Sequence, residues 1–165
     1  MRDWVVGAAL MWSDDGLLLV RNRRRNGRED WTPPGGVIEG DEPLLSGLAR
    51  EVREETGLTV TEWGGPVYEV RCLAPEMGWR LRVEVHVALG FEGSLHVDDP
   101  DGIVVDARFV PVDDLDAHLA DNQPWVREPL ADWLAQRWPP TETRPYDFHV
   151  AGVHPGELVV TRAVG

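Results

Sequence analysis

The segment from Gly36 to Leu58 constrains the fold more than any other part of the chain. It carries Gly36, then Glu42 after five residues, and after seven more the run Arg50-Glu51-Val52-Arg53-Glu54-Glu55-Thr56-Gly57-Leu58. The preceding Trp31-Thr32-Pro33-Pro34-Gly35 brings prolines and a glycine together, which disfavours an ordinary helix or a central strand. We therefore expect a stiff, irregular segment that leads into a distinct structural element.

The residues after this segment predict a helix from Pro43 to Thr56. Apolar or small side chains recur at three- and four-residue spacing and form one stripe: Leu45, Leu48, Ala49, Val52 and Thr56. Pro43 suits a first turn, where a missing N–H has no cost, and Gly57 offers a left-handed C-cap. The stripe should pack on a sheet.

Three glutamates stand at i, i+3 and i+4 of this helix: Glu51, Glu54 and Glu55. Their carboxylates share one face and repel one another, so a divalent cation would relieve the conflict. Hard carboxylate oxygens suit Mg²⁺ or Mn²⁺. The alternative is a solvated acidic face that pairs with Arg50 and Arg53.

Residues 36–58 match the box of the Nudix hydrolase family at every defining position, aliphatic Val52 and Leu58 included. The chain therefore resembles that family. The resemblance implies an α/β fold, the Nudix αβα sandwich, in which a mixed β-sheet lies between helices. It also implies Mg²⁺-dependent cleavage of a nucleoside diphosphate linked to another moiety, as in nucleoside triphosphates, ADP-ribose or nucleotide sugars, by water attack on phosphorus. A Nudix-fold module that binds a nucleotide without turnover is the alternative.

The resemblance further implies roles for individual residues. Glu51, Glu54 and Glu55 would hold the metal, and the Gly35 carbonyl would complete its shell. Glu51 and Glu54 would also act in catalysis together with Arg50, which would orient a glutamate through charge-assisted hydrogen bonds. Glu42 would support them near the helix start, and Gly47, one turn before Glu51, would leave room for a phosphate.

The identity of the general base stays open at this point. Many relatives carry a further glutamate before the strand that begins here at Ile103, whereas this chain has Asp98, Asp99 and Asp101. Asp101 is the first choice for an additional acid. Solvation of an aspartate-rich turn explains the same residues equally well.

Several features point toward substrate binding, each with a simpler explanation. The arginines at 21, 23, 24, 25 and 28 form either a phosphate-binding group, represented by Arg25, or a solvated loop. Gly36 exposes backbone beside the glutamate helix. Asn122 begins an Asn-Gln-Pro segment that resembles the purine-reading segment of MutT-like hydrolases, or is a helix N-cap. Pro75 lies where ADP-ribose hydrolases often carry a proline, and Trp79 or Trp125 could stack on a base or pack in the core.

The remaining pattern predicts how the fold is completed. Short apolar or alternating runs predict strands at Val5–Met11, Leu17–Val20, Val67–Leu73, Leu81–Leu89 and Ile103–Val110. The first two should pair as a hairpin through Asp15-Gly16, Arg21–Asp30 should be a polar loop, and Trp125–Trp138 should be a second helix. Phe148–Val150 and Leu158–Thr161 predict a terminal hairpin. We expect a Nudix domain at residues 1–140, with residues 141–165 as an extension packed on it.

Composition narrows the partners. A formal net charge of -13 argues against binding extended nucleic acid and favours a small, metal-neutralised nucleotide. Cys72 is the only cysteine, so no disulfide can form within the chain. No apolar run is long enough to cross a bilayer, so we expect a cytoplasmic protein without a membrane partner. An exposed edge in the terminal hairpin could pair two copies as a homodimer.

Overall fold

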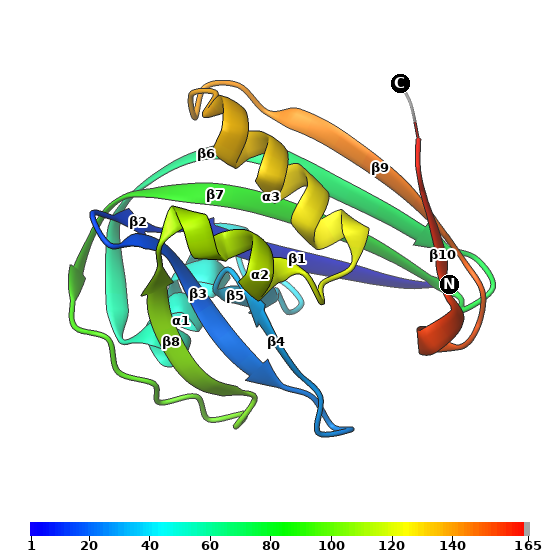
Figure 1. Cartoon of the computed structure of the whole chain (residues 1–165), viewed down its shortest axis with the longest axis horizontal. Coiled ribbons are helices and arrows are strands. Elements are labelled where there is room, and N and C mark those ends of the chain that lie inside the picture. Colours follow the sequence, from blue (N-terminus) through cyan, green and yellow to red (C-terminus); the bar gives the residue numbers. More distant parts are fainter. Residues whose placement is uncertain (164–165) are drawn as a thin grey trace.

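A mixed six-stranded sheet forms the centre of the computed structural model, which describes residues 1–163 (Figure 1). Its strands, in spatial order, are β10 (Val159–Arg162), β9 (Arg144–Ala151), β6 (Leu58–Ala74), β7 (Trp79–Gly93), β1 (Arg2–Leu10) and β5 (Gly35–Val37). β1 runs parallel to β7 and β6 runs parallel to β9, whereas the other neighbours are antiparallel. The short β5 lies at an edge of the sheet and directly follows Pro33 and Pro34.

A second sheet contains β2 (Trp12–Ser13), β3 (Gly16–Arg23), β4 (Glu29–Thr32) and β8 (Val104–Val110). The predicted pairing of the first two strands was wrong. β1 lies in the six-stranded sheet, and the turn pairs only the short β2 with the start of β3. β1 pairs instead with β5 and β7, which are distant in sequence. The chain therefore leaves the six-stranded sheet after Leu10 and enters the second sheet at β2.

Helices cover both faces of the central sheet, as expected for the αβα sandwich. α1 (Leu44–Thr56) lies behind the sheet in Figure 1, whereas α2 (Leu115–Leu119) and α3 (Pro124–Gln136) lie in front. Successive side chains of β1 point to opposite faces of the sheet and pack against the helices on each face. Ala9 packs in one core cluster with Leu48 and Val52 of α1, and Leu10 packs in another with Leu130 of α3.

α1 has the predicted ends but a slightly different apolar face. It follows Pro43 and ends at Gly57, which adopts φ 78° and donates its N–H to the Arg53 carbonyl at 2.9 Å. Leu48 and Val52 are buried, but Leu45 is 38% exposed, contrary to the prediction. Leu44 faces β1 instead, so the buried stripe begins one residue earlier.

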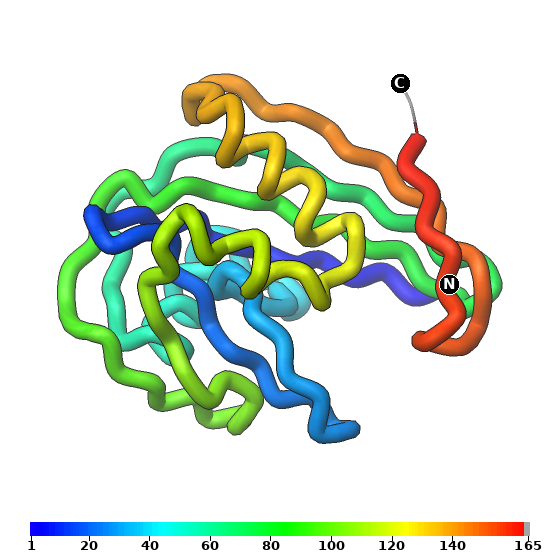
Figure 2. Tube along the Cα trace, viewed as in Figure 1, coloured from blue at the N-terminus to red at the C-terminus, as the bar shows by residue number. Residues whose placement is uncertain are grey.

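The predicted polar loop at Arg21–Asp30 is largely a β-hairpin, which extends beyond the helices in Figure 2 (blue). β3 continues through Arg23 and pairs with β4, so only residues 24–28 form the turn. Carboxylates of β4 pair with most of the arginines: Glu29 with Arg21 and Arg23, and Asp30 with Arg24. The charges that favoured a loop therefore lie on paired strands.

The C-terminal segment extends the central sheet. β9 adds in parallel to β6, and β10 forms the predicted hairpin with β9. Trp138, just before this segment, donates its indole N–H to the Val67 carbonyl at 2.6 Å. The domain division at residue 140 stays a prediction. None of the helices within residues 1–163 has the length and apolar character needed to span a membrane.

Candidate active site

The glutamate face of α1 lies directly against the glycine loop at β5. The Gly35 N–H donates to Glu55 Oε2 at 3.1 Å. The Gly36 Cα is so near Glu51 that an added Cβ would lie 3.1 Å from the carboxyl carbon. Two segments that the sequence singled out separately therefore form one site.

Arg50 connects the glutamates of this site. Its Nε and Nη2 donate to the two carboxylate oxygens of Glu42, each at 3.2 Å, and Nη1 donates to Glu51 at 3.3 Å and to Glu54 at 3.5 Å. The hydrogen bonds with Glu42 raise the pKa of Arg50, and the charges of Glu51 and Glu54 add to the effect. Arg50 therefore holds three carboxylates in place with one fixed positive charge.

Glu55 is the most deeply buried member of the site. It is 6% exposed, and desolvation raises its pKa to about 9, although the Gly35 N–H opposes the shift. Burial also raises the pKa of Glu51, which is partly offset by Arg50. Burial disfavours the charged form of this carboxyl. A bound cation would stabilise that charged form.

The carboxylate oxygens of this site suit a hard divalent cation, although the side chains do not form a complete coordination shell. Within the described part of the chain, no three acidic, histidine or cysteine side chains converge on one point. Arg50 holds oxygens of Glu51 and Glu54. The buried Glu55 and the neighbouring Glu51 and Glu54 nevertheless supply the carboxylate oxygens that Mg²⁺ prefers.

The acidic loop before β8 crosses the end of α1. The Asp98 N–H donates to the Glu54 carbonyl at 3.1 Å, and Asp99 accepts hydrogen bonds from the N–H groups of Asp101, Ile103 and Val104. Asp99 therefore shapes the loop. The exposed Asp101 is close enough for its charge to raise the pKa of Glu51. Its role as an additional acid stays a prediction.

A cavity of about 300 Å³, the cleft, leads from this site toward α3. Its polar end contains Asn22, Arg24, Thr32, Gly35 and Gly36, and its apolar walls include Tyr68, Val70, Leu81, Val83, Val85 and Trp125. The cleft therefore has one end beside the glutamates and an apolar interior of the kind that suits a small organic ligand.

The structure separates the predicted substrate-binding residues. Gly36 lines the cleft, whereas Arg25 is exposed in the β3–β4 turn and Arg24 lines the cleft in its place. Asn122 donates its side-chain amide to the Trp31 carbonyl at 2.6 Å and lies outside the cleft lining. Gln123, not Asn122, is the N-cap of α3. Substrate contacts by Arg25 and Asn122 stay predictions.

The structure also shows what surrounds two tryptophans and Gly47. Trp125 lines the cleft, and Trp79 packs against it edge to face with ring centroids 6.2 Å apart. The space beside Gly47 is taken by Glu42, because an added Cβ would lie 2.9 Å from Glu42 Oε2. The absence of a side chain at Gly47 thus admits a carboxylate of this chain rather than a phosphate.

Sequence reasoning did not single out Asn22 or Tyr68, and it named Arg24 only as one of five neighbouring arginines. The only signal for Asn22 was a polar residue that continues the apolar run Leu17–Val20 in strand register. Arg24 was not distinguishable from the four other arginines near it. Tyr68 lies in a predicted strand, where nothing local reveals which face borders a cleft.

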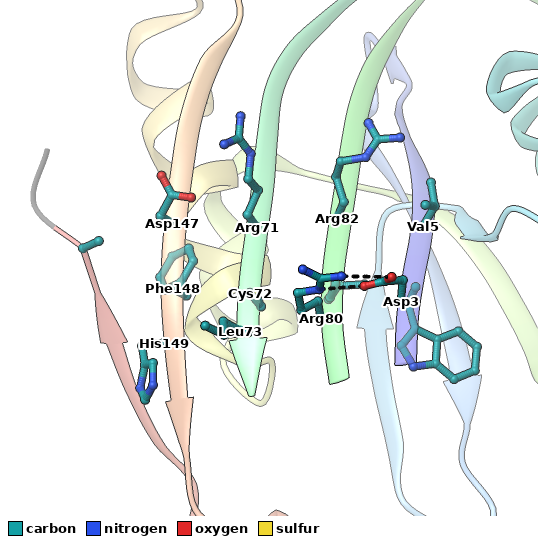
Figure 3. Close-up of a pocket in the computed structure, with 13 residues that line it drawn as sticks. Asp3, Val5, Arg71, Cys72, Leu73, Arg80, Arg82, Asp147, Phe148 and His149 are labelled. Carbon is teal, nitrogen blue, oxygen red and sulfur yellow. Dashed lines mark hydrogen bonds and ion pairs between the residues drawn. The ribbon is translucent and has the colours of Figure 1, made fainter. Parts of the chain in front are cut away.

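A larger cavity, of about 600 Å³, lies elsewhere on the central sheet and is lined by strands β9, β6, β7 and β1 (Figure 3). Figure 3 shows Arg71 and Arg82 on neighbouring strands, and Arg80 paired with Asp3. No residue of the 36–58 segment lines this cavity. Its size therefore does not make it the reaction site, because the grouped carboxylates are elsewhere.

Comparison with known proteins identifies the family of the chain. Residues 1–134 match the family model described as the NUDIX domain. A MutT-like protein of Streptomyces ambofaciens is 49% identical over 53 residues, covering 32% of this chain and 33% of that protein. The m7GpppN-mRNA hydrolase NUDT17 of Bos taurus is 33% identical over 93 residues, covering 53% of this chain and 31% of that protein. The chain thus spans about a third of the length of these curated relatives.

Solved structures share the fold at low sequence identity. The E. coli ORF135 protein has a TM-score of 0.66 at 23% identity, covering 83% of this chain and 94% of that one. The MutT protein of Bacillus halodurans has a TM-score of 0.64 at 20% identity, covering 96% and 97%. The family model spans most of the chain and includes the glutamate helix, the glycine loop and the cleft strands. The chain belongs to the Nudix family of hydrolases.

Proposed function

We propose that this protein is a Mg²⁺-dependent pyrophosphohydrolase that cleaves a nucleoside diphosphate linked to another moiety. One observation carries the proposal: Glu51 and Glu55 lie against the glycine loop, where Gly35 and Gly36 line the cleft, and Arg50 joins Glu51 to Glu54. A ligand whose base enters the apolar part would have its phosphates beside the carboxylates. Nucleoside triphosphates, ADP-ribose and nucleotide sugars all contain such a diphosphate.

Each residue of the site has a separate role in this proposal. Glu51, Glu54 and Glu55, with the Gly35 carbonyl, would hold Mg²⁺, which when bound would neutralise charge on the diphosphate and favour in-line attack by water. Arg50 positions Glu51 and Glu54 and remains positively charged throughout. Glu54, less buried than Glu51, is our choice for accepting a proton from the attacking water, with Asp101 as the alternative.

The test is hydrolysis of a nucleotide panel with products identified, with Mg²⁺ and with EDTA. The panel contains nucleoside triphosphates, oxidised nucleotides, ADP-ribose and nucleotide sugars. We expect Mg²⁺-dependent release of a phosphorylated nucleoside from at least one member, and a large loss of turnover in Glu54→Gln. Equal turnover by Glu54→Gln would remove Glu54 from catalysis, and tight binding of a panel member without turnover would favour a regulatory module.

Three further expectations concern the ligand class, the cellular compartment and the oligomeric state. The net charge of -13 supports a small-molecule nucleotide over extended nucleic acid. The single, buried Cys72 is compatible with a reducing, cytoplasmic compartment. Within residues 1–163, β10 pairs with β9 alone, so its other edge supports pairing with a second copy, which measurement of the mass in solution would test.

A further inference from the structure

Asn22 places a side-chain amide at the polar end of the cleft, whose other walls are largely apolar. It lies in β3, lines the cleft and is 6% exposed. Its amide nitrogen donates to Asp30 Oδ1 at 3.1 Å and to Thr32 Oγ1 at 2.9 Å. Both amide hydrogens are thus directed at β4.

Asp30 fixes the orientation of this amide. Arg24 forms a two-pronged pair with Asp30, with Nε 2.8 Å from Oδ2 and Nη2 2.9 Å from Oδ1. A carboxylate held in this way only accepts hydrogen bonds. Turning the Asn22 amide over would set its oxygen against that carboxylate, so the nitrogen must face Asp30 and Oδ1 must face away.

Asn22 Oδ1 is left as an accessible acceptor. It accepts no hydrogen bond from residues 1–163. In that range, the fully buried polar side-chain atoms that lack a hydrogen bond are Arg21 Nε, which only forms a longer ion pair with Glu29, and Trp133 Nε1. Because Oδ1 is not one of these atoms, it keeps some exposed surface, and Asn22 lines the cleft. A ligand that removes water from this acceptor binds less favourably unless it supplies a hydrogen-bond donor in place of the water.

We propose that Asn22 is a specificity-determining residue that selects ligands presenting an N–H donor from a flat, apolar group, as the edge of a nucleobase does. The aliphatic walls and Trp125 accommodate the faces of such a group, and Asn22 reads its edge. Asp30 and Thr32 are positioning residues that hold the acceptor in one orientation. This inference rests on the proposed function, because it needs the base to occupy the cleft.

The experiment compares ligands that differ in their donors alone. AMP is matched with purine riboside 5′-monophosphate, and CMP with pyrimidin-2-one riboside 5′-monophosphate, whose bases carry no N–H; GMP is also included. Monophosphates contain no anhydride bond, so they bind to the wild-type protein without being consumed. Calorimetry should give roughly tenfold tighter binding of at least one donor-bearing nucleotide than of its donor-free analogue.

Variants connect that preference to Asn22. Asn22→Ala should bring the matched ligands to within about twofold to threefold of each other, since the net value of one neutral hydrogen bond is lost. Asp30→Asn releases the amide orientation and should narrow the preference while ligands still bind. Asn26→Ala, in the turn of the same hairpin, should keep the full preference.

The inference is overturned if the donor-free analogues bind as tightly as their partners in the wild type, or if the preference survives in Asn22→Ala. It is also overturned if no monophosphate binds to a protein that hydrolyses nucleotides. Failure of the proposed function is separate, because it appears as absence of turnover across the whole hydrolysis panel.

Discussion

Arg50 and Glu42 form a two-pronged ion pair, in which Nε and Nη2 of the arginine each lie 3.2 Å from a different carboxylate oxygen. Glu42 precedes α1, and Arg50 is in its second turn, so the pair connects the start of the helix to its glutamate face. The third arm of Arg50 contacts Glu51 and Glu54. The planar guanidinium thus sets the positions of two proposed metal ligands.

Arg50→Lys should lower kcat by about 10–100-fold and raise the Mg²⁺ concentration needed for half-maximal activity. An ammonium keeps the charge but cannot donate two hydrogen bonds to Glu42 while also reaching Glu51. Steady-state kinetics over a Mg²⁺ titration measures both effects. Arg53→Lys on the exposed side of the same helix is the matched control and should behave as the wild type. Equal kinetics in the two variants would contradict the positioning role.

Glu55 should make the metal-free protein less stable as the pH rises. Its native pKa of about 9 lies above the ordinary 4.5, so the folded state holds a proton that the unfolded chain releases, and stability declines between these pH values. Glu55→Gln removes this dependence. In EDTA, the urea midpoint of Glu55→Gln relative to wild type should therefore increase from pH 5 to pH 9.

Mg²⁺ provides the counterpart to this measurement. It should stabilise the wild type more than Glu55→Gln at pH 8, because the buried carboxylate gains a cation. Urea midpoints of the two proteins that stay parallel across pH, with and without Mg²⁺, would show that Glu55 does not titrate in this way.

The sequence predicted the glutamate helix α1 well because the relevant geometry is local. The spacing of Glu51, Glu54 and Glu55 places them on one face whatever the rest of the fold does. Gly57 ends the helix for the same kind of reason, since its left-handed conformation depends on its own backbone. The glycine loop lies against that face, as the resemblance implied.

The cleft was not predictable, because it depends on pairing between distant strands. Asn22 meets Asp30 and Thr32 only through the β3–β4 ladder, and the cluster of arginines favoured a loop there. The opening strands were assigned correctly as strands but paired wrongly, since β1 takes its partners from β5 and β7. Leu45 was placed inside because a one-residue change in helix register still satisfies the spacing.

Gly36→Ala should reduce activity with little effect on stability. The added Cβ would lie 3.1 Å from the Glu51 carboxyl carbon and 3.3 Å from its nearer oxygen, so Glu51 must move by a few tenths of an ångström. We expect roughly a tenfold fall in kcat/KM and a change in unfolding free energy of less than about 1 kcal/mol. Gly156→Ala, which meets no atom within 4 Å, is the control. Unchanged kinetics in Gly36→Ala would mean that Glu51 tolerates displacement.

Trp125→Ala should raise KM about tenfold or more and change kcat little, because the ring borders the cleft together with apolar side chains and no glutamate lines that cavity. Stacking of a base on an aromatic side chain contributes about 1–3 kcal/mol, and this free energy is present in both the bound substrate and the transition state. Trp4→Ala is a matched control, since Trp4 is also half-buried but lines the cavity of Figure 3. If Trp4→Ala raised KM and Trp125→Ala did not, the nucleotide would occupy the larger cavity, and the assignment of the cleft would be wrong.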